Sequence, residues 1–272
     1  VDLKNGEADL DAIKAALADR SISAVLIQRS RGYENRKALS AEEIGEICSA
    51  VKSVAPNVTV MVDNCYGEFT GEHEPTEYGV DIMAGSLIKN PGGGLAPTGG
   101  YIVGRKDLVE NAAMRLTTPG IGGECGASLG NNRLLFQGFF MAPHIVAQAI
   151  KTVTFCSAMM KKIGFESSPA PDEARNDIIQ MVTLKNAENM KKFCRGVQAG
   201  APVDSYVTPE PWQMPGYNVP VIMAAGAFVQ GSSIELSADG PMREPYTLYV
   251  QGGITYESGK LGIMMAVNEM LS

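Results

Sequence analysis

The chain alternates short apolar stretches with stretches of helical period, and this alternation constrains its fold most. One of the helical stretches opens on Ser40-Ala41-Glu42-Glu43, which is typical of a capping box. Buried strands that alternate with helices predict an α/β fold with a mainly parallel sheet covered on both faces. The expected strands are 24–27, 58–62, 81–84 and 100–103, and the expected helices are 9–19 and 40–54.

A different pattern begins near residue 128. Long helical segments are expected over 128–163, with Pro143 as a break or kink. Beyond a connector at 169–171, strands are expected at 178–184 and 246–251, and helices at 186–197 and 259–271. We therefore predict two domains: residues 1–145, the C-terminal portion of a larger domain, and residues 146–272, a small α+β domain. The first domain offers only about four strands, fewer than a sheet of this kind usually has. We therefore expect the N-terminal part of that domain to be missing.

Composition excludes several classes of function. A net charge of −7 argues against a general nucleic-acid or anionic-membrane surface. Five widely spaced cysteines form no C-x-x-C pattern, and two distant histidines make a zinc site improbable, so we expect no metal. The longest apolar run, 219–229, is too short to span a bilayer. With no secretory signal visible, we expect a cytoplasmic protein.

An acid and an amine lie where predicted parallel strands end. Asp63 follows the strand at 58–62, and Lys89 stands between Ser86 and the glycines at 92–94. Ligands bind beyond the carboxyl ends of such strands. Pyridoxal phosphate needs an amine for its Schiff base, a carboxylate for its ring nitrogen, and hydroxyl or N–H donors for its phosphate. The pattern therefore predicts a pyridoxal-phosphate site in which burial lowers the pKa of the lysine.

Each of these residues also has an ordinary structural reading. Lys89 could be a solvated loop lysine, Asp63 could cap the turn that follows, and Ser86 could serve a turn. The loop at 29–33 is basic and aromatic and lies at the same sheet edge, where Arg31 could meet an anion or simply face solvent. Arg243 is a candidate to bind a substrate carboxylate bidentately, or to pair with a nearby acid.

Two motifs are rejected as sites. Residues 126–130 match the G-x-S-x-G nucleophile elbow, but no strand precedes them and no acid lies between Ser128 and His144. Residues 120–126 nearly match a dinucleotide fingerprint but have the wrong last spacing. A loop near the cofactor or at a subunit interface is the more natural interpretation of that glycine-rich segment.

Four long motifs carry a resemblance to a known family, and they are residues 28–33, 62–69, 86–97 and 228–237. They resemble the methionine gamma-lyase-like proteins known as aluminium-resistance proteins or cystathionine beta-lyase candidates, which are fold-type-I pyridoxal-phosphate enzymes. The resemblance covers essentially the whole chain. It implies Lys89 as the Schiff-base lysine, Asp63 as the ring-nitrogen partner and Ser86 as a phosphate ligand.

Further site residues are expected in these motifs and, for Arg243, in the segment 240–246. Asn64, Tyr66 and Ser30 are expected to contact the cofactor, and Arg243 and Arg31 the substrate. The implied reaction is elimination of a thiol from a sulfur-containing amino acid in a homo-oligomeric enzyme, either a dimer or a tetramer. The lysine–acid pair alone would equally allow transamination, decarboxylation or aldol cleavage.

The resemblance also implies parts that this chain does not show. In the superfamily, an N-terminal portion supplies a glycine turn for the phosphate and an aromatic that stacks on the ring. We therefore expect weak cofactor binding unless another segment, fragment or subunit completes the site. A non-catalytic interaction fragment is the alternative function.

Overall fold

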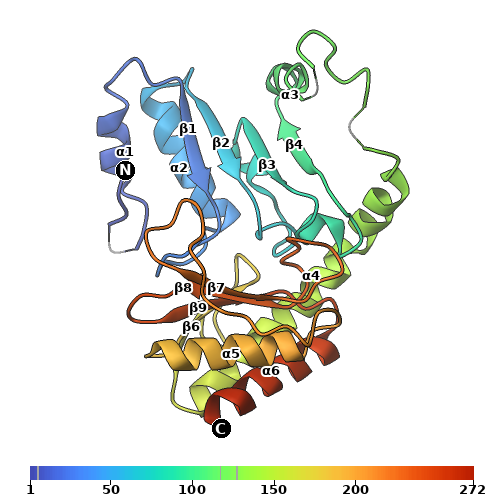
Figure 1. Cartoon of the computed structure of the whole chain (residues 1–272). Coiled ribbons are helices and arrows are strands. Elements are labelled where there is room, and N and C mark those ends of the chain that lie inside the picture. Colours follow the sequence, from blue (N-terminus) through green and yellow to red (C-terminus); the bar gives the residue numbers. More distant parts are fainter. Residues whose placement is uncertain (5, 117, 127) are drawn as a thin grey trace.

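The chain folds around two β-sheets, with a long helix running from one to the other (Figure 1). The computed structural model describes residues 1–4, 6–116, 118–126 and 128–272. Strands of the first sheet lie within residues 24–104 and those of the second within 166–251. The predicted domain boundary at residue 145 falls inside helix α4 (Asn132–Lys162), and it stays a prediction.

The first sheet has the order β1-β2-β3-β4, in which β1 to β3 are parallel and β4 is antiparallel to β3. The predicted α/β class is confirmed. The capping box is present, because Ser40 Oγ accepts from the Glu43 N–H and the Glu43 carboxylate accepts from the Ser40 N–H. The elements are α1 (Leu10–Ala16), β1 (Ala24–Gln28), α2 (Ala41–Val54), β2 (Thr59–Asp63), η1 (Pro75–Tyr78), β3 (Ile82–Ser86), η2 (Asn90–Gly92), β4 (Gly100–Gly104) and α3 (Lys106–Ala113).

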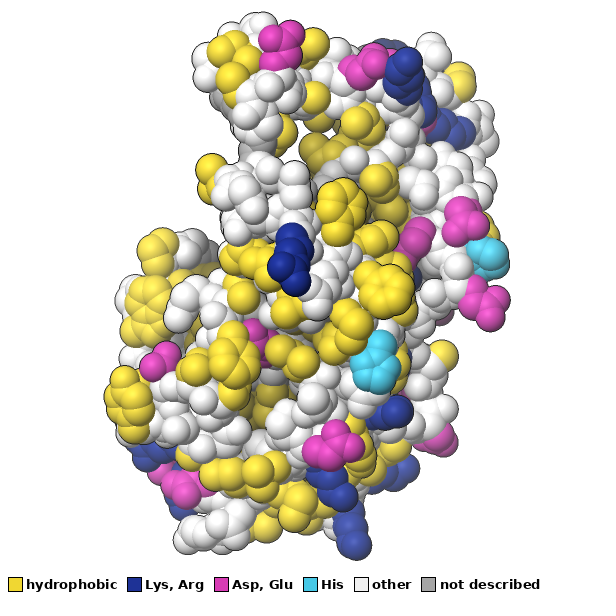
Figure 2. Space-filling model, turned by 90° about the vertical axis from the view of Figure 1, so that its right-hand side faces the viewer, with side chains coloured by type: hydrophobic (Ala, Val, Ile, Leu, Met, Phe, Trp, Pro, Cys, Tyr) yellow, Lys and Arg dark blue, Asp and Glu magenta, His cyan; other side chains and the backbone are white. Residues whose placement is uncertain are grey.

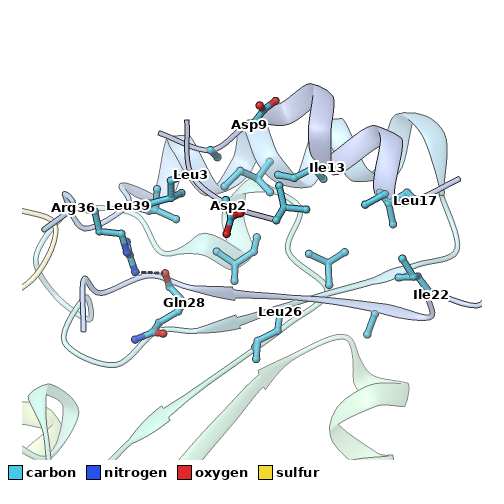
Figure 3. A pocket seen from close by; sticks show the side chains of 17 residues that line it. Asp2, Leu3, Asp9, Ile13, Leu17, Ile22, Leu26, Gln28, Arg36 and Leu39 are labelled. Atoms are coloured by element: carbon cyan, nitrogen blue, oxygen red, sulfur yellow. Dashed lines mark hydrogen bonds between the residues drawn. The ribbon is translucent and has the colours of Figure 1, made fainter. Parts of the chain in front are cut away.

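Helix α2 packs on one face of this sheet. Its Ile44 and Val51 are fully buried against Val60 and Val62 of β2. On the other face Leu26 is 68% exposed, and in Figure 3 its side chain points away from α1. The expectation that both faces are covered is therefore wrong for the described chain, because α1 and α2 lie together on one side.

The second sheet is antiparallel throughout, with the order β5-β6-β9-β8-β7. Helices α5 and α6 pack together on one of its faces around a core that includes Phe193, Leu248 and Ile263. Strands β5, β7 and β8 were not expected; β8 carries Ala238, Asp239 and Gly240, which are poor strand formers. The elements are β5 (Glu166–Ser168), β6 (Ile179–Thr183), α5 (Ala187–Ala199), β7 (Val221–Ala225), β8 (Ser237–Pro241), β9 (Thr247–Gln251) and α6 (Tyr256–Leu271).

Helix α4 continues through Pro143, so no break occurs there, and the alternative expectation of a kink stays a prediction. Proline removes one bond to the carbonyl four residues earlier. That carbonyl belongs to Phe139, a residue that is 55% exposed. By length and composition alone, α4 is also apolar enough to cross a membrane, a feature that the sequence analysis missed. A core helix passes the same test, and residues such as Val146 and Val153 of α4 are fully buried.

Candidate active site

Lys89 and Asp63 lie at the ends of neighbouring parallel strands. Asp63 closes β2, and Lys89 stands three residues beyond Ser86, the last residue of β3. The two loops are joined by Asn90, which is fully buried and donates from Nδ2 to the carbonyls of Tyr66 (3.1 Å) and Glu68 (3.0 Å). The polar pairing thus fixes the lysine loop against the loop that follows Asp63.

Close backbone contacts hold the lysine loop from its other side. A Cβ on Gly92 would lie 1.7 Å from the carbonyl oxygen of Leu87, so the loop closes only with glycine there. Gly92 also meets Gly138 of α4, where a Cβ would lie 2.2 Å from the Gly92 oxygen. Small residues therefore let α4 support the segment that carries Lys89.

The Lys89 amine lies over the ring of Tyr66, with Nζ 4.2 Å from the ring centroid. Tyr66 has a left-handed backbone (φ +73°), an unusual conformation for a bulky residue. Burial pulls the pKa of Lys89 down, but Tyr66, Cys65 and Asp63 outweigh it and leave the pKa raised. The predicted lowering is therefore wrong in this chain, because electron-rich groups from the neighbouring loop surround the amine.

The side chains near Asp63 fit the groups of pyridoxal phosphate, because the Lys89 amine suits its aldehyde and the Asp63 carboxylate suits its ring nitrogen. Asp63 Oδ1 accepts one hydrogen bond, from the Cys65 N–H at 3.1 Å, and the side chain is partly exposed. Ser86 is likewise partly exposed at the same strand ends. Ser30 is 3% exposed, at the end of the neighbouring β1. An amine, a carboxylate and a hydroxyl thus meet at one sheet edge.

Asn64 is engaged elsewhere. Its Oδ1 accepts from Arg29 Nη1 at 2.8 Å, and its Nδ2 donates to Glu74 at 3.0 Å and to the Tyr101 hydroxyl at 3.1 Å. Glu68 completes this buried network by accepting from the Tyr101 hydroxyl at 2.8 Å. The predicted cofactor contact of Asn64 stays a prediction, and in this structure its side chain braces the loop after β2.

Arg31 connects the two sheets. It is 1% exposed, its Nη1 donates to the carbonyl of Ser168 (3.1 Å), and its Nε lies 3.8 Å from Asp177 Oδ2. Arg175, which sequence reasoning missed, lies near the same acid. Its Nε and Nη1 are buried and have no hydrogen-bond partner among the described residues. The structure therefore gathers two guanidiniums around one carboxylate and leaves spare donors for another anion.

Arg243 lies in the turn between β8 and β9. Its side chain is exposed and acts electrostatically on Tyr249, as Arg31 also does. The two arginines predicted to bind substrate thus both act to lower the pKa of the same tyrosine. Their substrate roles stay predictions.

Asp239 is a second residue that sequence reasoning missed. It lies opposite Tyr249 in the β8–β9 pair and accepts from the Tyr33 hydroxyl at 2.6 Å. Burial raises the pKa of Asp239 to about 6, although Tyr33 and Lys89 act to lower it. Tyr33 packs on Tyr249 with ring centroids 5.1 Å apart. The sequence signal for Asp239 was weak, because it was only an acid within β8, a strand of poor strand formers.

Other candidate features lie away from Lys89. A hollow of about 350 Å³ lies between α1 and β1. In Figure 3, Ile13 and Leu17 face the strand, and Arg36 donates to the carbonyl of Gln28. Neither Asp63 nor Lys89 lines this hollow. Among the described residues no group of His, Cys, Asp and Glu could hold a metal. Ala127, within the rejected G-x-S-x-G match, lies outside the described residues.

The architecture is that of the fold-type-I pyridoxal-phosphate enzymes. It matches cystathionine gamma synthase from Xanthomonas oryzae pv. oryzae with a TM-score of 0.58 at 14% identity, covering 96% of this chain and 66% of that one, a likeness of fold alone. The chain belongs to the methionine gamma-lyase family, whose model matches residues 1–271. The predicted family is confirmed.

Two relatives are much nearer in sequence. An uncharacterised protein of Bacillus subtilis (strain 168) is 51% identical over 272 residues, which are 100% of this chain and 64% of that protein. A carbon-sulfur lyase involved in aluminum resistance from Clostridium novyi NT is 50% identical with a TM-score of 0.92, and the match covers 98% of this chain and 62% of that one. The chain thus spans less than two thirds of the length of either relative.

Proposed function

We propose that this chain carries the lysine and acid of a pyridoxal-phosphate-dependent carbon–sulfur lyase. The substrate would be a sulfur-containing amino acid, cleaved as by a cystathionine beta-lyase or methionine gamma-lyase. The observation that carries the proposal is the meeting of Lys89 and Asp63 at adjoining strand ends, close enough for Asp63 to raise the pKa of Lys89. Family membership and the name of the Clostridium novyi relative support the choice of reaction.

The chemistry divides between the cofactor and the chain. When bound, pyridoxal phosphate withdraws electrons from Cα of an amino acid and so stabilises negative charge there. The Asp63 carboxylate would accept a hydrogen bond from the protonated ring nitrogen, and Ser86 would donate to the phosphate. Lys89 would take the proton from Cα at Nζ and could deliver it to the departing sulfur. The raised pKa of Lys89 means that Nζ must first lose its own proton.

Arginines would hold the carboxylate of the substrate. Arg243 is exposed in the turn between β8 and β9, and two guanidinium nitrogens of Arg175 have no hydrogen-bond partner in the part of the chain that the structure describes. A bidentate pair between a guanidinium and a carboxylate fixes orientation as well as position. We place the enzyme in the cytoplasm as a homo-oligomer, without a nucleic-acid or membrane partner.

Chemical trapping tests the proposal. The purified chain is mixed with pyridoxal phosphate, reduced with borohydride and digested, and the labelled peptide is identified by mass spectrometry. We expect one cofactor per chain at Lys89, with the label lost in Lys89→Ala. Lys185→Ala is the matched control, because Lys185 also lies over an aromatic ring, 5.0 Å from the centroid of Phe165.

Two results would contradict the proposal. One is a label spread over surface lysines and unchanged in Lys89→Ala. The other is a folded chain that stays colourless with pyridoxal phosphate, even after the region of the Clostridium novyi relative that has no counterpart here is added. The second result would favour the non-catalytic alternative. Release of thiol and keto acid from sulfur amino acids then distinguishes the lyase from other pyridoxal-phosphate chemistry.

A further inference from the structure

Tyr66 stands at a turn position that favours glycine. The N–H of Gly67 donates to the carbonyl of Asn64 at 3.0 Å, which closes a turn over residues 64–67. Tyr66 is the third residue of that turn and has a φ of +73°, whereas the φ of Cys65 is not positive. This is the pattern of a type II turn, whose third position favours glycine. The turn itself therefore gives no reason for a tyrosine.

Neighbouring contacts hold this strained turn in place. The Tyr66 carbonyl accepts from Asn90 Nδ2 at 3.1 Å, and Asn90 is fully buried. The Cys65 N–H donates to Asp63 Oδ1 at 3.1 Å. A bulky residue in the left-handed region persists only where its surroundings fix it, and such residues cluster at functional sites. The side chain of Tyr66 is therefore a candidate for a function of its own.

The Tyr66 ring lies in apolar surroundings where the two sheets meet. It packs against a cluster that includes Ile145 of α4, and against another that includes Met181 of β6 and Tyr249 of β9. Figure 2 shows hydrophobic side chains gathered across the middle of the face that β4 and α4 present. Lys89 is partly buried in these surroundings. Its amine has lost part of its hydration there, so the charged form needs a partner.

The face of the Tyr66 ring is such a partner. Lys89 Nζ lies 4.2 Å from the ring centroid, well inside the reach of about 6 Å over which a ring face attracts a cation. This attraction acts on the ammonium and not on the neutral amine. Asp63 and Cys65, from the end of β2 and the loop after it, also act on the amine, as does Asp239 of β8. All these groups come from segments that pack around the lysine loop.

We propose that Tyr66 is a positioning residue that holds the protonated Lys89 amine over its ring, and that this contact breaks before Lys89 bonds to an aldehyde. The inference rests on the proposed role of Lys89. An ammonium has no lone pair to share, so Nζ first gives its proton to water and loses its attraction to the ring. The neutral amine then adds to the aldehyde carbon, and the aldehyde oxygen leaves as water while a C=N bond forms. Tyr66 thus keeps the resting lysine in place and unreactive.

NMR of the chain with carbon-13 at Cε of its lysines tests this position without cofactor. The Lys89 signal is assigned with Lys89→Arg, and we expect its Hε protons upfield, because the face of an aromatic ring shields protons above it. Tyr66→Leu should remove this shift and lower the pKa of Lys89 by about one unit, the worth of a cation–π contact. Tyr66→Phe keeps a ring and should retain most of both effects. Lys185, over Phe165, is the control in the same spectra and should not change.

Acetylation by trace acetic anhydride at pH 8 measures the reactivity of each lysine. Lys89 should react about three- to tenfold faster in Tyr66→Leu, because a lower pKa leaves more neutral amine. Circular dichroism checks folding, and Tyr66→Met is a second ring-free variant.

The proposal is overturned if the wild-type Lys89 signal lacks the upfield shift, or if folded ring-free variants leave its pKa and acetylation unchanged. It is also overturned if Tyr66→Phe has the full effect of Tyr66→Leu, since the hydroxyl would then be the partner. Failure of the borohydride label at Lys89 would instead contradict the proposed function, so the two failures are distinguishable.

Discussion

Three buried carboxyl groups hold protons more tightly than carboxyls in water do. Burial raises the pKa of Glu68 to about 7 and that of Asp239 to about 6, and it also raises the pKa of Asp177. Each accepts at least one hydrogen bond, yet each keeps one oxygen without a hydrogen-bond partner among the described residues. Desolvation therefore outweighs hydrogen bonding at all three residues.

Glu68 should make stability fall as pH rises. Its folded pKa of about 7 exceeds the ordinary 4.5, so the folded state binds the extra proton between these values. Stability is then lost as pH rises through this window, by about 2–3 kcal/mol between pH 5 and 8. Glu68→Gln should flatten this slope in urea unfolding, whereas the exposed Glu72→Gln should not. An unchanged slope in Glu68→Gln would show that Glu68 is ionised throughout.

The hydroxyl of Tyr33 should hold down the pKa of Asp239. It donates at 2.6 Å, and this bond opposes the effect of burial. Tyr33→Phe should raise the pKa of Asp239 above 6 by about one to two units, the worth of a hydrogen bond to a charged group. Carbon-13 NMR titration of the carboxyl measures it. Tyr206→Phe, at an 86% exposed position, should leave the titration as it was.

At the scale of elements, the capping box at the start of α2 sets where that helix begins. Ser40→Ala should lower the free energy of unfolding by about 1 kcal/mol, because it leaves the Glu43 N–H without its partner. Glu43→Ala removes the reciprocal bond to the Ser40 N–H. In a double-mutant cycle by urea unfolding, we expect the two changes to be less than additive. Full additivity would mean that the two bonds form independently.

At the scale of the whole molecule, Arg31 should couple the two sheets. Arg31→Met removes one of the two guanidiniums near the buried Asp177 carboxyl and the donor to the Ser168 carbonyl, and we expect it to cost about 3–5 kcal/mol of stability. Asp177→Asn added to Arg31→Met should restore part of the loss. Lys37→Met is the control: Lys37 pairs with Glu173 at 3.3 Å across the same junction but is 79% exposed, so its loss should cost under about 1 kcal/mol. Equal losses in urea unfolding would disprove the coupling.

The sequence by itself determined the parts of the molecule whose signals are local. Apolar runs located β1, β2 and β3, Ser40 and Glu43 located the start of α2, and the strand ends brought Asp63 and Lys89 to one edge. These signals depend on neighbours a few residues apart, and a parallel sheet then aligns its strand ends without further information. Strand β8 was not predicted, because its small residues and its acid do not form the apolar pattern of a strand.

Only the tertiary structure decided what surrounds those residues. It turned Tyr66 under Lys89 and raised the pKa of that lysine, and it committed Asn64 to a buried network. It also placed Asp239 beside Tyr33, a residue 206 positions away in the chain. Burial and electrostatics depend on the contacts of distant segments, so no local pattern records them.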